Sequence, residues 1–162
     1  MQIVLQRVQR AAVHVVDAPG TPPEQGRVTG QIGPGLVALV GVGHRSTDDD
    51  ARWLAAKTAG LRVFADEQGR MNRALADIDG GVLAISQFTL YGDVSRGRRP
   101  SFVGAAEPQQ GSRLYDVYCD ALVWDAGVPV GRGEFGAMMV VDFLADGPVT
   151  LLLRREGGTA DG

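Results

Sequence analysis

The stretch VLAISQFTLY, residues 82–91, begins as an apolar strand and changes its character before it ends. Its four apolar residues are followed by Ser86, Gln87 and Thr89, where a core strand would continue with Val or Leu. We predict a strand over the whole stretch, in which the two-residue period places Gln87 and Thr89 on the same face as Ile85. Such a strand either passes from the core into a cleft or ends in solvent, and both interpretations fit these residues.

The rest of the chain alternates between strand and helix patterns. Helices are predicted over residues 46–60 and 108–126, because each segment combines an N-terminal signal with an apolar stripe. Residues 18–27, rich in proline and glycine, and the polar residues 93–101 are predicted loops. These elements indicate a mixed α/β (α+β) protein with two main helices and many antiparallel strands. Apolar periodicity predicts further strands over residues 2–16, 28–32, 36–42, 61–64, 137–144 and 149–153.

The composition is that of an ordinary globular protein. The chain has 162 residues, of which 44% are hydrophobic and 22% charged, and this length suits a single domain. We assign residues 1–153 to that domain and expect residues 154–162 to form a disordered tail. No apolar run approaches the ~20 residues of a membrane span, and the N-terminus lacks a signal-peptide pattern. We therefore expect a cytoplasmic protein without a membrane partner. The net charge of −3 restricts any RNA contact to a local site.

Several weak motifs favour structural explanations. GVGH, residues 41–44, lacks the third glycine of a dinucleotide-binding loop, so a tight turn is the preferred explanation. Two histidines and one cysteine offer no zinc-ligand spacing, and we expect no metal site. Cys119 has no histidine near it in the sequence and fits a small packed thiol better than a nucleophile. A single cysteine also excludes an internal disulfide.

Two further motifs leave two explanations open. GRRPSF carries Arg98 and Arg99 in a polar loop, where they are either solvated charges or phosphate contacts. DGPVT, residues 146–150, is either a plain turn between two strands or a place where a cis Gly147–Pro148 bond orients backbone carbonyls. Glycine at this point also allows another molecule to approach those carbonyls closely.

Taken together, these motifs resemble the D-aminoacyl-tRNA deacylases, also called D-tyrosyl-tRNA deacylases. SQFTL and GPVT are similar to the two signature motifs of that family and occur in the expected order. The resemblance covers residues 1–153. It also includes QRV at 6–8, the segment GPGLVALVGV, GRMN at 69–72 and GRRPSF at 97–102.

The resemblance implies a homodimer with a barrel-like, largely antiparallel sheet, two helices packed outside it, and no metal ion or organic cofactor. It implies hydrolysis of the ester between a D-amino acid and the 3′-terminal adenosine of tRNA. In this family the Gly-Pro bond is cis and enters the pocket of the other subunit, where its carbonyls exclude L side chains. By motif position, the resemblance implies catalytic roles for Ser86, Gln87, Phe88 and Thr89, substrate binding by Gly147, Pro148, Arg7, Met139, Phe135 and Ala106, and tRNA binding by Arg98 and Arg99. Arg7 matches an arginine that holds the Gly-Pro loop in place.

The sequence departs from the family's usual pattern in two places. Residues 18–27 look inserted in the first hairpin. Ahead of the GPVT motif, Glu134, Met138, Val140 and Ala145 stand where the family usually has Arg, Asp, Gln and Asn. By the resemblance, these changes affect the rim of the pocket more than the residues expected to carry the chemistry.

The expected chemistry requires placement more than a strong nucleophile, because an aminoacyl ester is already activated. Gln87 and Thr89 can hold polar groups of the substrate, and backbone N–H groups near Phe88 and Thr89 can face the developing oxyanion. The 2′-OH of the terminal adenosine can orient the attacking water. Thr89 as a covalent nucleophile is less favoured, because no base lies beside it in the sequence.

Selection of D substrates by rejection of L side chains has one consequence for the substrate range. Two alternative functions also remain open. Carbonyls that reject L side chains do not fully exclude glycine, so action on glycyl-tRNA, including glycine mischarged on another tRNA, is also expected. The alternatives are a non-catalytic dimeric RNA-binding module and an editing hydrolase for mischarged L-amino acids. The net charge of −3 opposes the first alternative.

Overall fold

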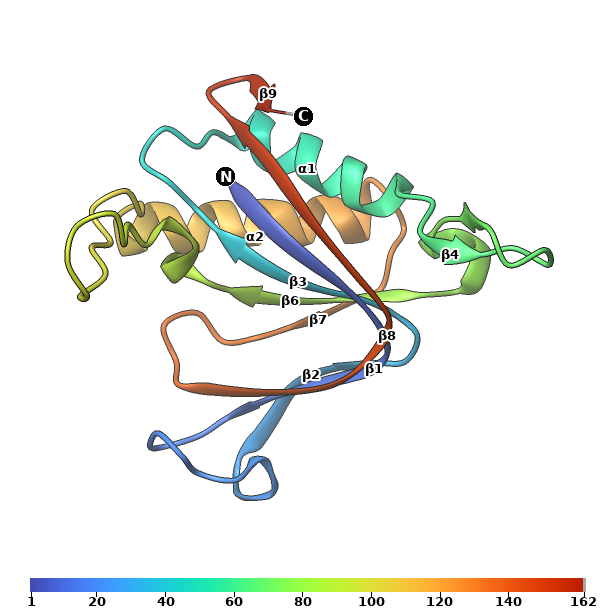
Figure 1. Ribbon diagram of the computed structural model, residues 1–162, viewed down its shortest axis with the longest axis horizontal. Coiled ribbons are helices and arrows are strands. Elements are labelled where there is room, and N and C mark those ends of the chain that lie inside the picture. Colours follow the sequence, from blue (N-terminus) through green and yellow to red (C-terminus); the bar gives the residue numbers. More distant parts are fainter. Residues whose placement is uncertain (162) are drawn as a thin grey trace.

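One curled sheet carries the fold, and both helices cover the same face of it (Figure 1). The structure is a computed structural model that describes residues 1–161, with side chains described for residues 1–158. The elements follow in the order β1 (Gln2–Val15), η1 (Pro23–Gln25), β2 (Arg27–Ile32), β3 (Gly35–Gly41), α1 (Asp48–Gly60), β4 (Phe64–Ala65), β5 (Met71–Arg73), η2 (Leu75–Ile78), β6 (Gly81–Ser86), η3 (Phe88–Tyr91), α2 (Pro108–Trp124), β7 (Val130–Arg132), β8 (Met139–Glu156) and β9 (Thr159–Asp161).

Strand β1 organises the sheet, because it pairs with three other strands. The order is β7-β6-β3-β1-β8-β9, and β2 pairs with the second half of β1. The pairs that β1 makes with β2, β3 and β8 are antiparallel, whereas β3–β6 and β6–β7 are parallel. Parallel neighbours need crossover connections, and α1 and α2 lie in these two crossovers. Two crossovers of the same hand place both helices on one face.

The two ends of the sheet approach each other, which makes the sheet barrel-like. Strands β1 and β8 bend together away from the helices, and β2 comes close to β7 (Figure 1). A Cβ atom at Gly30 would lie 2.6 Å from the Arg132 nitrogen, and one at Gly131 would lie 3.0 Å from the Gln31 nitrogen. Glycine is therefore needed where β2 and β7 meet. The predicted fold class, a mixed α/β protein with a barrel-like sheet and two outer helices, is confirmed.

Strands β3 and β6 are buried on both faces, which explains their unbroken apolar runs. Leu36, Ala38 and Val40 of β3 face the helices, whereas Val37 faces the inside of the curled sheet. The helix-side core also contains Ile3, Leu5, Leu54, Val82, Ala84, Leu114, Tyr118 and Leu122, and the inner core contains Val8, Ala11, Val13, Leu83 and Ile85.

The helix boundaries follow local signals in the sequence. Thr47 caps α1: its Oγ1 accepts the Asp50 N–H at 3.2 Å, while the Asp50 carboxylate accepts the Thr47 N–H at 3.0 Å. Helix α2 begins at Pro108, a residue suited to a first turn, and ends at Trp124, two residues before the predicted end. The two helices contact each other, and the Tyr118 hydroxyl of α2 donates to Thr58 Oγ1 of α1 at 3.1 Å.

Two predicted strands are wrong in extent. The strand predicted over residues 82–91 ends at Ser86, and the chain continues as the 3₁₀ turn η3, in which the Leu90 N–H donates to the Gln87 oxygen at 3.3 Å. The predicted alternation of Gln87 and Thr89 with Ile85 therefore does not hold beyond Ser86. The strand predicted over 61–64 is reduced to Phe64–Ala65, which pairs with β5.

The C-terminal third also differs from the prediction. The segments predicted as separate strands over residues 137–144 and 149–153 form one long strand, β8, which pairs with β1 along its length. The predicted disordered tail continues this strand to Glu156 and returns as β9, while Gly162 lies outside the described residues. Gly157 and Gly158 have φ values of +64° and +85°, as a two-residue hairpin turn requires. The Gly-Gly pair is the sequence signal that the prediction missed.

Candidate functional site

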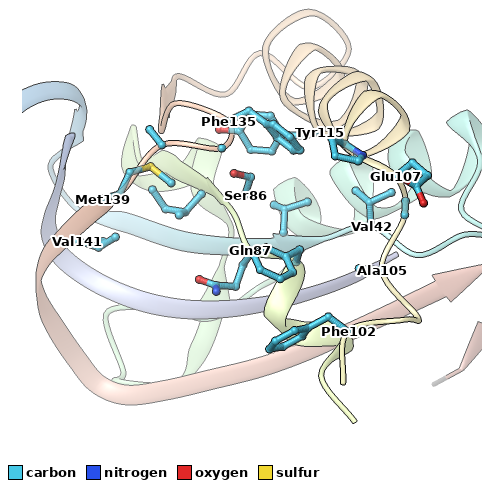
Figure 2. Close-up of a pocket in the computed structure, with 18 residues that line it drawn as sticks. Val42, Ser86, Gln87, Phe102, Ala105, Glu107, Tyr115, Phe135, Met139 and Val141 are labelled. Atoms are coloured by element: carbon cyan, nitrogen blue, oxygen red, sulfur yellow. The ribbon is translucent and has the colours of Figure 1, made fainter. Parts of the chain in front are cut away.

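A cavity of about 660 Å³ opens where β6 ends, between η3, the start of α2 and the segment that follows β7 (Figure 2). Its walls are mainly apolar, and polar side chains come from few positions. The lining residues are Val40, Val42, Ile85, Ser86, Gln87, Phe88, Phe102, Ala105, Ala106, Glu107, Pro108, Gly111, Tyr115, Phe135, Gly136, Ala137, Met139 and Val141. A mainly apolar cavity with a few convergent polar groups is typical of a small-ligand site.

The end of β6 supplies the polar wall. The Gln87 N–H donates to the Val40 oxygen at 2.7 Å, which is the last bond of this strand to β3. The chain then turns, so that the Gln87 side chain lines the cavity and donates through Nε2 to Thr89 Oγ1. Phe88 and Thr89 open the 3₁₀ turn, where backbone N–H groups have no acceptor within the turn itself. The polar end of the strand thus reaches a cleft, one of the two alternatives that the sequence left open.

The opposite wall is held by Tyr115, a residue that the sequence analysis did not select. Its hydroxyl donates to the Ala84 oxygen at 2.9 Å and lies 3.4 Å from the Gly133 oxygen. The Gly133 N–H also donates to the Ala84 oxygen, at 2.9 Å, so these groups meet where β6 and β7 separate. Burial raises the pKa of Tyr115, which keeps the hydroxyl protonated as a donor. The Tyr115 and Phe135 rings lie side by side, with their centroids 6.4 Å apart.

Six of the residues named from the sequence line this cavity. They are Ser86, Gln87, Phe88, Ala106, Phe135 and Met139. Thr89 is exposed and does not line the cavity, but its Oγ1 accepts a hydrogen bond from the lining residue Gln87. Phe102 and Gly111 also line the cavity, although the sequence analysis gave them no role. Their residue types were visible in the sequence, but only the fold brings them to one place.

Arg7, Gly147 and Pro148 do not line the cavity of their own chain. The Arg7 side chain is largely buried, forms an ion pair with the Asp146 carboxylate at 2.9 Å and also donates to the Asp146 oxygen at 3.2 Å. The pairing of β1 with β8 shifts here, from Gln6 opposite Thr150 to Val8 opposite Ala145, so the Gly-Pro segment bulges out of the strand. The Gly147–Pro148 peptide bond is cis.

Arg98 and Arg99 lie at the exposed tip of the loop between η3 and α2. The base of this loop is closed by two backbone hydrogen bonds between Asp93 and Ser101, of 2.7 and 2.9 Å. Within residues 1–158, neither arginine is part of an ion pair. Their charges are therefore available to an external anion.

Groups that could supply other kinds of catalysis lie elsewhere or are inert. Cys119 is buried, and burial raises the pKa of its thiol to about 12. His44 is exposed, and its Nε2 is bonded to the Val103 oxygen. In the part of the chain that the structure describes, no group of three His, Cys, Asp or Glu side chains is placed to hold a metal ion. Across the same residues, no helix has the length and apolar character to span a membrane.

The curled sheet, with a mainly apolar cavity beside two separating parallel strands, is that of an α/β protein with a candidate small-ligand site. The sequence profile described as "D-Tyr-tRNA(Tyr) deacylase" matches residues 4–154, and the chain belongs to this family of hydrolases. It is 50% identical over 155 residues to the D-aminoacyl-tRNA deacylase of Exiguobacterium sibiricum, covering 96% of this chain and 100% of that relative. It is 52% identical over 153 residues to the D-aminoacyl-tRNA deacylase of Deinococcus radiodurans, covering 94% and 99% of the two chains.

Solved structures with the same fold give a consistent result. A protein described as "c-Myc DNA Unwinding Element Binding Protein" superposes with a TM-score of 0.84 and 33% identity, over 96% of this chain and 99% of that one. A probable eukaryotic D-amino acid tRNA deacylase superposes with a TM-score of 0.76 at 18% identity, over 93% and 97% of the two chains, and supports the fold alone.

Proposed function

We propose that this protein hydrolyses the ester bond of D-aminoacyl-tRNA, releasing the free D-amino acid and the tRNA, with residues 1–153 acting as one domain. The observation that carries the proposal is the polar end of β6, where Ser86 and Gln87 line an apolar cavity in a chain of the deacylase family. The substrate suits that cavity, because the faces of an adenine ring and many amino acid side chains are apolar, while the ribose and the ester are polar.

The catalytic step proceeds by placement of a water molecule. Within the described residues, no histidine or cysteine lines the cavity, so general base catalysis by those side chains has no candidate there. Thr89 Oγ1 accepts a hydrogen bond from Gln87, which leaves the Thr89 hydroxyl proton available to a substrate oxygen or to the water. The backbone N–H groups of Phe88 and Thr89 stabilise the oxyanion, and the adenosine 2′-OH orients the water.

Chiral selection is assigned to Gly147 and Pro148 of a second subunit. These residues lie outside the cavity of their own chain, and Arg7 ties the segment to β1 through Asp146. In a homodimer, this outward bulge enters the cavity of the partner and places its carbonyl oxygens where an L side chain would lie. Glycine has no side chain to reject, so glycyl-tRNA mischarged on a non-cognate tRNA is a further substrate.

Exposed apolar side chains of β8 support the homodimer. Phe143, Leu144 and Leu152 are large apolar side chains exposed on this strand. Large apolar side chains left exposed along one strand are typical of a surface that is covered in an assembly. The tRNA backbone is contacted by Arg98 and Arg99, and a tRNA substrate places the enzyme in the cytoplasm.

The decisive experiment compares release of amino acid from matched D- and L-aminoacyl-tRNA. We expect rapid release from the D-aminoacyl ester, slower release from glycyl-tRNA and background release from the L-aminoacyl ester. Faster cleavage of the L-aminoacyl ester would instead support an editing hydrolase for L-amino acids. Binding of tRNA without any release would support the non-catalytic RNA-binding module, which the net charge of −3 disfavours.

A further inference from the structure

Two aromatic side chains meet at the mouth of the cavity and remain open to solvent. The rings of Phe88 and Phe102 pack edge to face, with centroids 5.1 Å apart and an interplanar angle of 73°. Both line the cavity, yet Phe88 is 59% and Phe102 is 37% exposed. Aromatic pairs usually bury their surface, so an exposed pair at a cavity mouth offers an apolar face to a ligand.

The backbone around Phe102 is built to hold its ring. Phe102 directly follows the Asp93–Ser101 bridge that closes the loop, and its oxygen accepts the Ala105 N–H at 3.0 Å. A Cβ atom at Gly92 would lie 3.0 Å from Phe102 Cε1, so glycine gives the ring its room. The ring is therefore positioned by the fold, while the tip of the loop stays exposed.

Positive charge lies in the same loop. Arg96, Arg98 and Arg99 are exposed in the loop between Asp93 and Ser101, directly before Phe102. Among residues 1–158, none of the three is part of an ion pair. In a chain with a net charge of −3, this loop is a local site at which an anion is attracted.

Exposed aromatic rings beside arginines are the elements of a single-stranded nucleic-acid site. We propose that Phe88, Phe102 and the arginine loop bind the unpaired nucleotide that precedes the terminal adenosine of the tRNA. Its base stacks on Phe102, and its phosphate lies towards Arg98 and Arg99. This inference rests on the proposed function, in which the terminal adenosine and its aminoacyl group occupy the cavity.

The positions of the aromatic walls indicate the direction in which the RNA leaves the cavity. Phe135 and Tyr115 lie along one side of the cavity and Phe102 along the opposite side (Figure 2). Because the ester lies against the end of β6, the RNA leaves the cavity over the side that carries positive charge. The following base meets Phe102 there. Stacking on an aromatic ring tolerates any base, as an enzyme that acts on different tRNAs requires.

The test compares two substrates that share the ester and the adenosine. One is D-aminoacyl-tRNA, and the other is the 3′-O-D-aminoacyl ester of adenosine, which lacks the preceding nucleotide. Replacing Phe102→Leu should lower kcat/KM for the tRNA about tenfold, equal to about 1.4 kcal/mol, mainly through KM. The loss for the adenosine ester should be at most a third of that, and Phe102→Trp should restore cleavage of the tRNA.

The matched control is Trp124→Leu, which changes another aromatic residue, 80% exposed at the end of α2, that does not line the cavity. It should not discriminate between the two substrates. Equal losses on both substrates after Phe102→Leu, or no loss on the tRNA, would overturn the proposed subsite. A wild-type protein that cleaves neither substrate would refute the proposed function itself.

A measurement on the wild-type protein covers the case in which Phe102→Leu does not fold. A dinucleotide ending in 3′-adenosine should inhibit cleavage of the adenosine ester about tenfold more strongly than adenosine 5′-monophosphate does. Both inhibitors carry the phosphate, so the difference reports the added base. Equal inhibition by the two compounds would also overturn the subsite.

Discussion

At the scale of single residues, the proposed chemistry depends on the hydrogen bond between Gln87 and Thr89. The Gln87 amide donates to Thr89 Oγ1, which orients the Thr89 hydroxyl and fixes the Gln87 side chain at the cavity wall. Among residues 1–158, neither side chain is hydrogen-bonded to a histidine, a lysine or a carboxylate that could remove a proton from Thr89. Cys119 is excluded as a nucleophile by its burial and by a thiol pKa raised to about 12.

Thr89→Ala should lower kcat for D-aminoacyl-tRNA about tenfold without abolishing it, because one hydrogen bond of about 1.4 kcal/mol is lost. Single-turnover release of the D-amino acid measures the effect. Thr89→Ser keeps the hydroxyl and should retain most of the activity. A trapped acyl-Thr89 adduct, or complete inactivity of a folded alanine variant, would show that Thr89 is a covalent nucleophile instead.

At the scale of secondary-structure elements, the cavity exists because β6 and β7 pair over three residues and then separate. The pairing ends at Ala84 opposite Arg132, and Tyr115 of α2 occupies the point of separation. Its hydroxyl contacts the carbonyl groups of Ala84 and Gly133, which precede Ser86 and Phe135 by two residues each. Tyr115 is therefore a positioning residue for both walls.

Tyr115→Phe should raise KM for D-aminoacyl-tRNA several-fold, because loss of this hydrogen bond lets the Phe135 wall move. Tyr118→Phe is the matched control: Tyr118 is a buried tyrosine of the same helix, and its hydroxyl bonds to Thr58 away from the cavity. Both variants should lose about 1 kcal/mol of unfolding free energy. Equal kinetics for the two variants at equal stability would contradict a positioning role for Tyr115.

A second pair of elements is joined by the Asp50 carboxylate. Asp50 is fully buried at the start of α1, where it accepts the Thr47 N–H, Arg155 Nε, and the N–H groups of Gly157 and Gly158 at 3.0–3.3 Å. Burial acts to raise the pKa of Asp50, but the hydrogen bonds from Gly158 and Thr47 hold it below its ordinary value of 3.8. This contact, rather than a disordered tail, fixes the β8–β9 turn.

Asp50→Asn should lower the unfolding free energy by about 1–3 kcal/mol at pH 7, because a charged acceptor is lost from a buried site. A carboxyl with a depressed folded-state pKa stabilises the fold above its ordinary value of 3.8 and loses this effect as the pH falls through the folded-state pKa. Denaturant titrations at pH 7 and pH 3 should therefore show a smaller difference between wild type and variant at pH 3. Asp49→Asn, an exposed change in the same turn, serves as the control.

At the scale of the whole molecule, the proposed role of the Gly-Pro bulge in selection requires a second copy. Gly147 and Pro148 lie on β8 outside the cavity of their own chain, so a monomer cannot use them to select a substrate. The same strand exposes Leu152, which points away from the helices because its neighbours Leu151 and Leu153 pack against the helix-side core. Assembly and selectivity are thus expected to depend on one surface.

Leu152→Arg should shift the protein from dimer to monomer and reduce deacylation together with it, because a charge would replace an apolar side chain in the interface. Sedimentation velocity over a range of concentrations measures the first effect. Leu152 is 53% exposed in the single chain, and Met71→Arg, at a residue 60% exposed on β5, is the matched control. A variant that is monomeric and fully active would contradict the cross-subunit assignment.

The sequence by itself determined the local features of this protein. Thr47 and Pro108 mark helix starts, the apolar run of β3 marks a strand buried on both faces, and SQFTL and GPVT identify the family. Each of these signals depends on neighbouring residues and on backbone preferences, so the sequence is enough to predict the feature. Ser86 and Gln87 were also selected from the sequence, because polar residues at the end of a core strand stand out, and both line the cavity.

Only the tertiary structure decided which of these features come together. It ended β6 at Ser86, merged two predicted strands into β8 and brought Tyr115, Phe102 and Phe135 to one cavity. These outcomes depend on the register between β1 and β8 and on the two helical crossovers. Such pairings join residues that are distant in the chain, and their free energy comes from hydrogen bonds and burial that exist only once the sheet has curled.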